Sequence, residues 1–252
     1  MRISVVTPVY NDPRVARALD SILSQREAGD VELVVIDGGS KQETQDVLAR
    51  YKDRIDILVS ERDRGIYDAM NKGVARATGD IVGILNADDR YMDEHVLRDV
   101  ARAFEDPAVD VSYGDVLLED DAKRPVRLWR AGRYSRAKLY LGWMPPHPGF
   151  FVRKRFYDHH GAFRLDMRIA ADYEHQLRLF LKHGARPAYV PRVLVRFAVG
   201  GQSSGSWRKV VQGNREVRRA WVSNGLRGGL LVPVLKPAQK APQYIAAKLR
   251  RG

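Results

Sequence analysis

Strand-like and helix-like segments alternate over the first 118 residues, and this alternation constrains the fold more than any other feature. Apolar runs predict five strands, at residues 2–7, 31–37, 55–60, 80–85 and 109–118. Helical spacing of apolar residues predicts four intervening helices, at residues 13–25, 42–51, 65–77 and 93–104. Strands that alternate with helices form a parallel sheet covered by helices on both faces. The sequence therefore predicts an α/β fold with a mainly parallel central sheet.

The alternation weakens after about residue 120. Apolar runs predict three further strands, at residues 123–130, 149–152 and 188–197, and helical spacing predicts a helix at residues 171–182. A Gly/Ser-rich hinge at residues 200–205 then opens a basic segment. We therefore expect an α/β domain over residues 1–200 and a basic helical tail over residues 201–252.

Positive charge is concentrated in this tail. The formal net charge is +12, and residues 201–252 contribute +10 because eleven Lys and Arg residues are opposed by one acid, Glu216. Aromatic and apolar residues recur among the basic ones: Trp207, Val210, Val211, Val217 and Trp221. Such a helix is typical of an anionic membrane surface, and the apolar stretch 226–235 is expected to dip into the headgroups. The alternatives are a helix packed on the main domain or on a second subunit, and nucleic-acid binding, for which no recognition motif is present.

Three features that the sequence lacks indicate the cellular compartment of the protein. The chain has no Cys, which suits a reducing environment. A strand-like run begins at Ile3 without a charged leader and apolar segment before it, so we expect no signal peptide. No apolar run reaches the roughly 18 residues of a membrane-spanning helix. These features predict a cytoplasmic protein, peripheral on the inner face of the plasma membrane if its tail binds lipid.

Polar residues follow four of the predicted strands, at residues 10–12, 37–40, 61–63 and 86–89. In open α/β sheets the ligand binds beyond the carboxyl ends of the strands, so these residues are expected to carry chemistry. A dinucleotide-binding fold would have a Gly-x-Gly-x-x-Gly loop after the first strand. This chain has Pro8-Val9-Tyr10-Asn11 there, which disfavours NAD binding.

Asp88 and Asp89 form an acidic pair after the fourth predicted strand. Adjacent carboxylates repel each other unless a cation joins them. Mg²⁺ and Mn²⁺ prefer carboxylate oxygens and leave positions for substrate phosphates. We predict that this pair binds a divalent cation. The alternative is that Asp89 or Asp93 caps the following helix, and we favour capping for Asp93.

The order and spacing of these motifs resemble the family 2 inverting glycosyltransferases, which have the GT-A fold. The resemblance covers roughly residues 2–200. It is carried by residues 5–11, 21–25, 32–40, 63–73, 77–80 and 86–89. Residues 65–73, Gly-Ile-Tyr-Asp-Ala-Met-Asn-Lys-Gly, are similar to a bacterial subgroup that builds surface polysaccharides or glycolipids. The resemblance implies sugar transfer from a nucleotide-diphosphate donor to a hydroxyl of a saccharide or lipid-linked acceptor.

For the donor, the resemblance implies that Asp37 hydrogen-bonds the base and that the turn at residues 8–11 cradles the nucleoside. It implies that Asp88, with Asp89 beside it, reaches a divalent metal on the diphosphate. The predicted nucleotide-binding residues are Pro8, Tyr10, Asn11, Asp37, Asp68, Asn71 and Asn86. Asn86 departs from the family, since many relatives have Asp there. The site therefore loses one negative charge, and we expect looser metal dependence.

An inverting transfer needs a base that deprotonates the acceptor hydroxyl. The resemblance places this base at Asp172, where Ala171 replaces the usual preceding Glu. The alternative for Asp172 is a purely structural acid favoured by the helix dipole, and Glu174 is a rival base. His147 and Arg178 are predicted to contact acceptor or diphosphate. For His147 the alternative is a structural role, and for Arg178 it is an ion pair with a nearby acid.

The predicted function is therefore that of a metal-dependent glycosyltransferase with UDP-sugar as the default donor. GDP and dTDP sugars are the alternative donors. A non-catalytic nucleotide-sugar-binding or scaffold protein of the same fold is the main competing interpretation, and the acidic pair together with Asp172 disfavours it.

Overall fold

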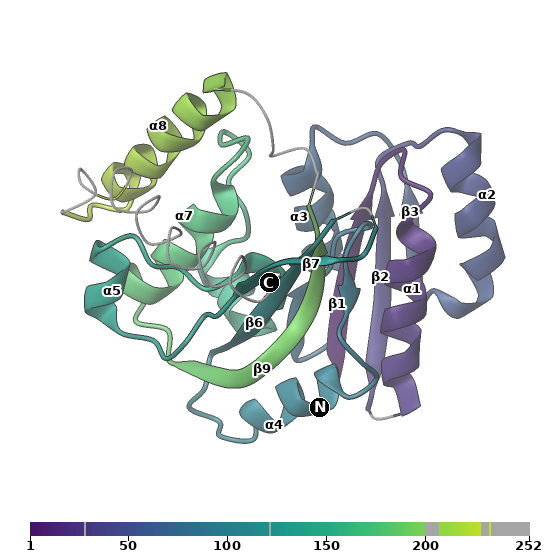
Figure 1. Cartoon of the computed structure of the whole chain (residues 1–252), viewed down its shortest axis with the longest axis horizontal. Helices are drawn as coiled ribbons and strands as arrows, with labels where there is room; N and C mark the ends of the chain where they lie inside the picture. The colour runs from purple at the N-terminus through teal and green to yellow at the C-terminus, as the bar shows by residue number, and fades with distance from the viewer. Residues whose placement is uncertain (28, 121, 200–206, 228–231, 233–252) are drawn as a thin grey trace.

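The computed structural model describes the chain except at residues 28, 121, 200–206, 228–231 and 233–252, which are grey in Figure 1. The described strands form one nine-stranded sheet in the order β3-β2-β1-β4-β8-β6-β9-β5, with β7 paired to β6. The strands are β1 (Ile3–Val9), β2 (Val31–Asp37), β3 (Ile57–Ser60), β4 (Ile81–Ile84), β5 (Arg90–Tyr91), β6 (Val111–Glu119), β7 (Pro125–Trp129), β8 (Phe150–Arg153) and β9 (Pro187–Ala198).

The first half of the sheet is parallel, as the sequence predicts. Strand β1 pairs in parallel with β2 and β4, and β2 pairs with β3. Every residue of β1 and β2 is buried, because helices cover both faces of these strands. The helices of this half are α1 (Val15–Leu23), α2 (Gln42–Tyr51), α3 (Ile66–Arg76) and α4 (Val96–Ala103).

Two apolar cores lie on opposite faces of the sheet. Successive residues of a strand point to opposite faces, so Val5 joins one core and Val6 the other. Helices α1, α2 and α4 pack on the face of Val5, and α3 packs on the face of Val6. Figure 1 shows α1 and α2 at one end of the sheet and α7 and α8 at the other.

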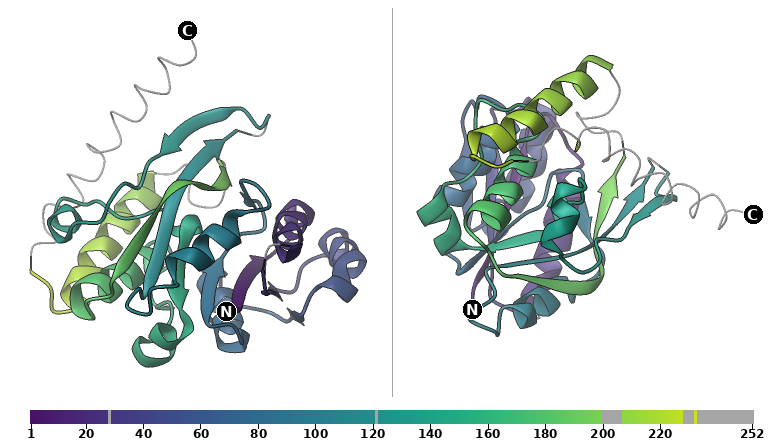
Figure 2. Two further views of the ribbon diagram at one scale, coloured as in Figure 1. Left: turned by 90° about the horizontal axis from the view of Figure 1, so that it is seen from below. Right: turned by 90° about the vertical axis from the view of Figure 1, so that its left-hand side faces the viewer.

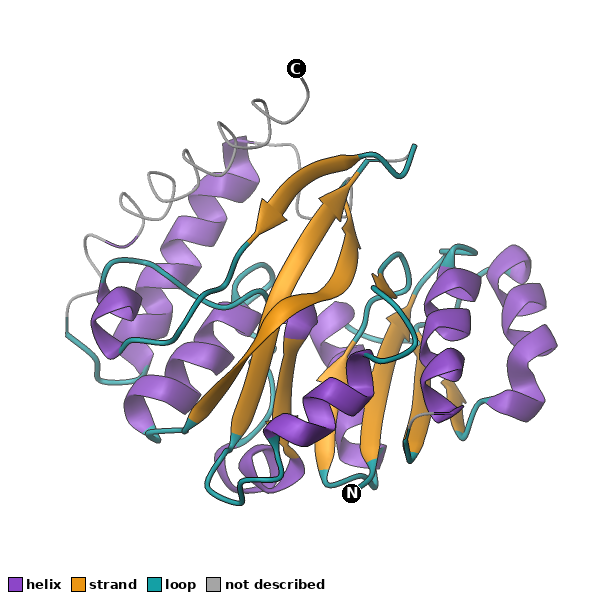
Figure 3. Ribbon diagram, turned by 60° about the horizontal axis from the view of Figure 1, so that its bottom comes forward, coloured by secondary structure: helices purple, strands orange, loops and turns teal. Residues whose placement is uncertain are grey.

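The second half of the sheet is mixed. Strand β8 is antiparallel to both β4 and β6, whereas β6 and β9 are parallel to each other. Figure 3 shows the long strands of this half extending past the shorter parallel strands. The helices here are α5 (Arg136–Tyr140), α6 (Lys154–His160), α7 (Ala171–Leu177), which continues as a π-helical segment (Arg178–Lys182), and α8 (Trp207–Ser223).

Helix α8 packs against α7, as both views in Figure 2 show. Its inward face buries Val217, Ala220 and Trp221, and the Trp221 indole N–H donates to the Tyr173 hydroxyl at 2.9 Å. Of the alternatives left open for the tail helix, packing on the main domain is the one that the structure shows for Trp221. The side chain of Trp207 and most of the apolar stretch 226–235 lie outside the described residues. In the described part of the chain, no helix is long and apolar enough to cross a membrane.

Candidate active site

The turn after β1 and the loop after β2 are tied together at the carboxyl edge of the sheet. The Asn11 backbone N–H donates to Ser40 Oγ at 2.8 Å, and the Lys41 N–H donates to Asn11 Oδ1 at 2.8 Å. Asn11 has a positive φ of 50°, a conformation that Asn tolerates better than most residues. The structure therefore brings these two predicted nucleoside-binding segments side by side.

Gly38 leaves a narrow space between two side chains at this edge. A Cβ atom at Gly38 would lie 2.3 Å from Asp63 Oδ2 and 3.3 Å from the Tyr10 ring. Tyr10 is 56% exposed, so its ring is available to a planar ligand, whereas Pro8 is buried within β1. Asp63 was not among the predicted site residues, although it belongs to a polar strand end.

Asp37 is fully buried at the end of β2. Its carboxylate accepts hydrogen bonds from the Ser40 N–H at 3.1 Å, from Gln45 Nε2 at 2.5 Å and from Ser60 Oγ at 2.5 Å. These bonds fix the side chain in one orientation at the edge where a base is expected to bind.

Helix α3 contributes Asp68 and Asn71. Burial raises the pKa of Asp68, but hydrogen bonds from Arg64 outweigh it and leave this pKa lowered. Asn71 exchanges two 2.8 Å hydrogen bonds with the backbone N–H and C=O of Phe163. Its amide therefore cross-links the two halves of the molecule, and its role in donor binding stays a prediction.

The acidic pair after β4 has one buried and one accessible member. Asp89 is fully buried and accepts hydrogen bonds from the Ala198 N–H and the Asn86 side-chain amide, both at 3.1 Å. Asp88 is partly exposed and lies 3.6 Å from Arg14 Nη2. Burial raises the pKa of Asp88 and, with the charge of Asp88, strongly raises that of Asp89. The charged form of this pair is thus disfavoured until a cation approaches.

The site around Asp88 can hold a divalent cation only if the sugar donor's diphosphate supplies further oxygen ligands. Across the described ranges, no group of three or more His, Cys, Asp and Glu residues is arranged to hold a metal ion. Asp88 offers one accessible carboxylate, and the buried Oδ1 of Asn86 has no hydrogen-bond partner in the described structure. Mg²⁺ commonly binds through one or two carboxylates plus substrate phosphates, so these residues fit a cation held jointly with a diphosphate.

Asp172 lies at the start of α7, half-buried, beside α3 of the first half. The Tyr67 hydroxyl lies 3.2 Å from Asp172 Oδ1 and 3.0 Å from the Ile169 carbonyl oxygen. Tyr67 immediately precedes Asp68 in α3, so this helix links the predicted base to the predicted donor pocket. In the sequence Tyr67 belongs to the motif at residues 65–73, which assigned it no role.

His147 lies close to Asp172 within a cluster of rings. It packs edge-on against Phe163 at 5.8 Å, and Phe163 in turn contacts His175 at 4.8 Å. Burial lowers the pKa of both histidines, and the Asp172 charge partly opposes this for His147. Both Nε2 atoms are buried without a hydrogen-bond partner among the described residues. Both rings are therefore neutral at pH 7.

Two other candidates serve a structural role. Arg178 is buried, pairs with Glu174 at 3.0 Å, and donates to the carbonyls of His160, Gly161 and Ala162. Of the two alternatives for Arg178, the ion pair with an acid is the one that the structure shows. Glu174 is fully occupied by Arg178 and Asn224, which removes it as a rival base.

Sequence reasoning missed Arg14 and Glu216. Arg14 lies next to Asp88, and its only sequence signal is its place in the turn that follows β1. The Glu216 carboxylate accepts a hydrogen bond from the Ile169 backbone N–H, three residues before Asp172. The one sequence feature that could have indicated this residue is that it is the single acid of the basic tail.

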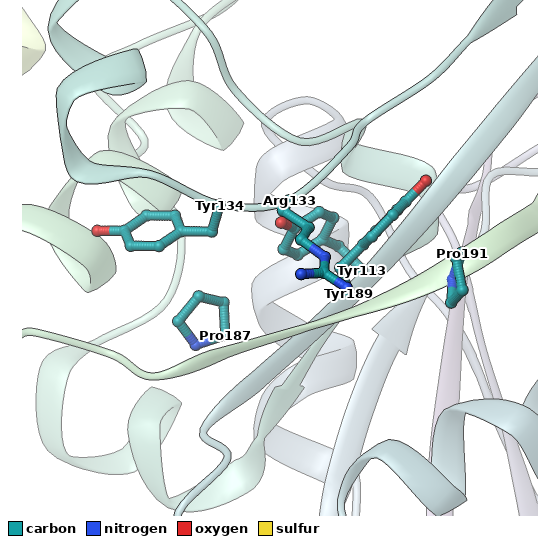
Figure 4. A pocket seen from close by; sticks show the side chains of 6 residues that line it. All are labelled: Tyr113, Arg133, Tyr134, Pro187, Tyr189 and Pro191. Atoms are coloured by element: carbon teal, nitrogen blue, oxygen red, sulfur yellow. The ribbon is translucent and has the colours of Figure 1, made fainter.

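A separate cavity of about 400 Å³ lies between β6, β9 and the segment before α5. It is lined by Tyr113, Arg133, Tyr134, Pro187, Tyr189 and Pro191 (Figure 4). Tyr113 and Tyr189 stack with ring centroids 5.5 Å apart. None of the residues predicted for donor, metal or base lines this cavity.

Comparison with known sequences gives one family. The model described as "Glycosyl transferase family 2" matches residues 4–161. A "PGL/p-HBAD biosynthesis glycosyltransferase" of Mycobacterium tuberculosis is 31% identical over 195 residues, covering 76% of this chain and 73% of the relative. An "Uncharacterized glycosyltransferase" of the same species is 31% identical over 207 residues, covering 80% and 77%.

Comparison with solved structures gives the same fold. Residues 1–349 of Staphylococcus aureus TarS in complex with UDP-GlcNAc align with a TM-score of 0.66 and 16% identity, covering 98% of this chain and 79% of that one. The longer TarS structure is covered over only 39% of its length. The Pyrobaculum calidifontis mannosyltransferase PcManGT, in complex with GDP-Man and Mn²⁺, aligns with a TM-score of 0.66 and 22% identity, covering 100% and 76%.

Proposed function

The chain belongs to glycosyl transferase family 2, has the GT-A fold and is a glycosyltransferase of bacterial glycan biosynthesis, and we propose that it is an inverting enzyme. Its proposed donor is a nucleoside-diphosphate sugar, UDP-linked by default. Its proposed acceptor is a hydroxyl of a saccharide or lipid-linked glycan of the cell surface. The main support is the placement of Asp172 against Tyr67, next to the donor-side residue Asp68 on the same helix.

In the proposed reaction Asp172 takes the proton from the acceptor hydroxyl. The acceptor oxygen forms a bond to the anomeric carbon as the bond from that carbon to the diphosphate oxygen breaks, and the nucleoside diphosphate leaves. Tyr67 orients the Asp172 carboxylate through its hydroxyl. The neutral His147 ring beside Asp172 adds no positive charge that would weaken the base.

On the donor side, Tyr10 and Asp37 are proposed to hold the base, and the tied turns at Asn11 and Ser40 the nucleoside. Asp88 would hold a Mn²⁺ or Mg²⁺ ion, with the unpartnered Asn86 Oδ1 as a second oxygen, and Asp89 fixes the Asn86 amide by accepting from its Nδ2. When bound, such an ion offsets the charge that develops on the leaving diphosphate. Arg14, which pairs with Asp12 at 2.6 Å, brings its guanidinium within 3.6 Å of Asp88 at the same place.

The substrates named for relatives support the donor and acceptor classes. The structural neighbours were solved with UDP-GlcNAc and with GDP-Man plus Mn²⁺. The mycobacterial relatives are named for PGL/p-HBAD biosynthesis. These observations favour a pyrophosphate-linked donor and a glycan product, and they make UDP and GDP the first nucleotides to test.

A thermal-shift panel of UDP, GDP and dTDP, each with and without Mn²⁺, tests the donor proposal. A ligand at one hundred times its Kd stabilises the folded state by about 2.7 kcal/mol. For a chain of this size that raises Tm by about 5–10 °C. We expect this rise for one nucleotide, larger with Mn²⁺. If a nucleotide binds but the corresponding nucleotide sugar is neither hydrolysed nor used for transfer, the protein is a non-catalytic nucleotide-sugar-binding protein rather than an enzyme.

We also propose that the tail places the enzyme on the inner face of the plasma membrane. Helix α8 leaves Val210 and Val222 64% and 70% accessible, and its Arg215 and Arg218 are exposed as well. Flotation with anionic and neutral vesicles tests this. We expect binding to anionic vesicles only, weakened in Arg215→Glu/Arg218→Glu. Equal binding of that variant would contradict the proposal.

A further inference from the structure

We propose that Glu216 on α8 is a positioning residue for the catalytic base, so that the C-terminal helix is part of the active-site framework. The inference rests on the proposed function, because it takes Asp172 as the base. Glu216 lies 44 positions after Asp172 in the sequence and outside the residues that the family model matches.

The Glu216 carboxylate is bonded to the segment that leads directly into α7. Its Oε1 accepts from the Arg168 N–H at 3.1 Å, and its Oε2 accepts from the N–H groups of Ile169 at 2.8 Å and Ala170 at 2.9 Å. Three consecutive amides thus converge on one side chain two residues before Asp172. Gln212, one turn earlier on α8, donates to Oε1 at 2.9 Å and fixes the carboxylate in turn.

The same segment is held from its other side by Tyr67. The Ile169 N–H meets Glu216, while the Ile169 carbonyl oxygen lies 3.0 Å from the Tyr67 hydroxyl that also faces Asp172. The chain entering α7 is therefore clamped between α3 of the donor half and α8 of the tail. A shift of this segment would move the Asp172 carboxylate relative to Tyr67.

Glu216 is suited to this role by its charge and its surroundings. Burial raises the pKa of Glu216, but the bonds from the Ile169, Arg168 and Ala170 amides outweigh it and leave this pKa lowered. The carboxylate is thus ionised at neutral pH, and hydrogen bonds to an ionised acceptor are about twice as strong as neutral ones.

Two further contacts anchor α8 to α7 independently of Glu216. Trp221 donates to the Tyr173 hydroxyl at 2.9 Å, and Asn224 donates to Glu174 Oε1 at 2.9 Å. Since Trp221 is also buried in the core, α8 is expected to stay docked when Glu216 alone is replaced. Replacement at 216 should therefore release residues 168–170 without detaching the helix.

The first test measures hydrogen–deuterium exchange of the amides at residues 168–170 in the full chain. Glu216→Ala should exchange there at least about tenfold faster, with little change in β1 or β2. Glu216→Gln, which keeps one acceptor oxygen, should fall between Ala and the original chain. Asn214→Ala is the matched control, since Asn214 is an exposed residue of the same helix. Unchanged exchange in Glu216→Ala would overturn the proposal.

The second test is a double-mutant cycle on turnover of UDP-GlcNAc and GDP-mannose with Mn²⁺, measured as released nucleoside diphosphate. A misplacement of about 1 Å can lower a rate about 10²-fold. We expect Glu216→Ala to lower kcat by about 10- to 100-fold, with donor KM within twofold. In an Asp172→Asn background the same change should lower kcat by less than about twofold, since residues that act as a unit are not additive.

The outcomes separate the two proposals. Full multiplicative loss in the Asp172→Asn background, or a parallel rise in donor KM, would show that Glu216 acts on folding in general and would overturn the inference. Two other results would count against the proposed function instead. They are undiminished turnover by Asp172→Asn, and no turnover of either donor by a chain whose amides at residues 168–170 are protected as predicted. Neither result would bear on the bonds between Glu216 and residues 168–170.

Discussion

The donor half and the acceptor half of the site are built in different ways. Around the donor, Asp37 is held largely by Ser40 and Gln45, which follow it within eight positions on the next loop and helix. Around the acceptor, Asp172 is oriented by Tyr67, 105 positions earlier in the chain, and the segment before it by Glu216. Asp37 is thus held largely by residues close to it in the sequence, whereas the base depends on contacts that form only in the complete fold.

The largest effect is expected at the base. Asp172→Asn removes the proton acceptor while keeping a side chain of similar shape that can still bond Tyr67. A general base contributes about 10²–10⁴ in rate, so kcat for transfer or donor hydrolysis should fall by that factor. The Kd for nucleotide, measured by calorimetry, should stay unchanged because the donor half is organised separately. If Asp172→Asn weakened nucleotide binding by a factor as large as its loss of kcat, the donor and acceptor halves of the site would not be independent.

The two halves also differ in what the sequence alone predicts. Strand β2 and helix α2 have the predicted limits, because a buried parallel strand and an amphipathic helix each have a local periodicity. Helices α5 and α6 and the two-residue strand β5 were not predicted, since they are too short to show a period. The antiparallel insertion of β8 between β4 and β6 was not predicted either, because strand pairing across distant segments has no signal in a single sequence.

The same division applies to the site. The motifs at the strand ends indicated Asp37 and Asp88, and the resemblance indicated Asp172 at the start of a helix, whereas the partners that orient Asp172 lie far away along the chain. Arg178 shows the converse, because a basic residue on a helix gives no signal of whether it meets a phosphate or, as here, an acid and three carbonyls. The sequence left open whether Trp221 faces a membrane or packs on the main domain, because burial by another helix is not visible in a basic sequence.

The next largest effect is expected at Asp88. Asp88→Asn removes the accessible charge of the acidic pair and should lower turnover about 10²- to 10³-fold, the range seen when one group that stabilises a leaving oxyanion is lost. Turnover measured against Mn²⁺ concentration should lose its metal dependence. The control is Asp93→Asn, since Asp93 is paired with Arg192. Unaltered Mn²⁺ dependence in Asp88→Asn would remove this residue from the metal site.

A smaller effect is expected where the two halves are cross-linked. Asn71→Ala leaves the Phe163 N–H and C=O without their side-chain partner, and an unsatisfied buried group costs about 1–3 kcal/mol. We expect Tm to fall by about 2–10 °C in differential scanning calorimetry. The exposed Asn214→Ala is the matched control and should leave Tm unchanged. Equal Tm values for the two variants would show that the halves do not depend on this link.

The smallest effect concerns pH. Burial lowers the pKa of His175 and His147 below the ordinary value of 6.5, so the folded state binds fewer protons than the unfolded state below that pH. The free energy of unfolding should therefore be highest above pH 6.5 and fall as the pH decreases towards 5.5, which urea titrations would measure. The fall should shrink in His175→Phe and persist in His95→Gln. A fall of the same size in His175→Phe as in the original chain would contradict the burial of the His175 ring as a neutral group.

The carboxyl edge of the parallel strands is proposed to bind a nucleoside diphosphate together with a divalent cation at Asp88. Calorimetric titration of UDP and GDP into the full chain, with and without Mn²⁺, tests it most directly. We expect Mn²⁺ to tighten binding of one nucleotide at least about tenfold, and we expect Asp88→Asn but not Asp172→Asn to abolish this gain. Binding of neither nucleotide, or identical affinities in all three proteins with and without Mn²⁺, would contradict it.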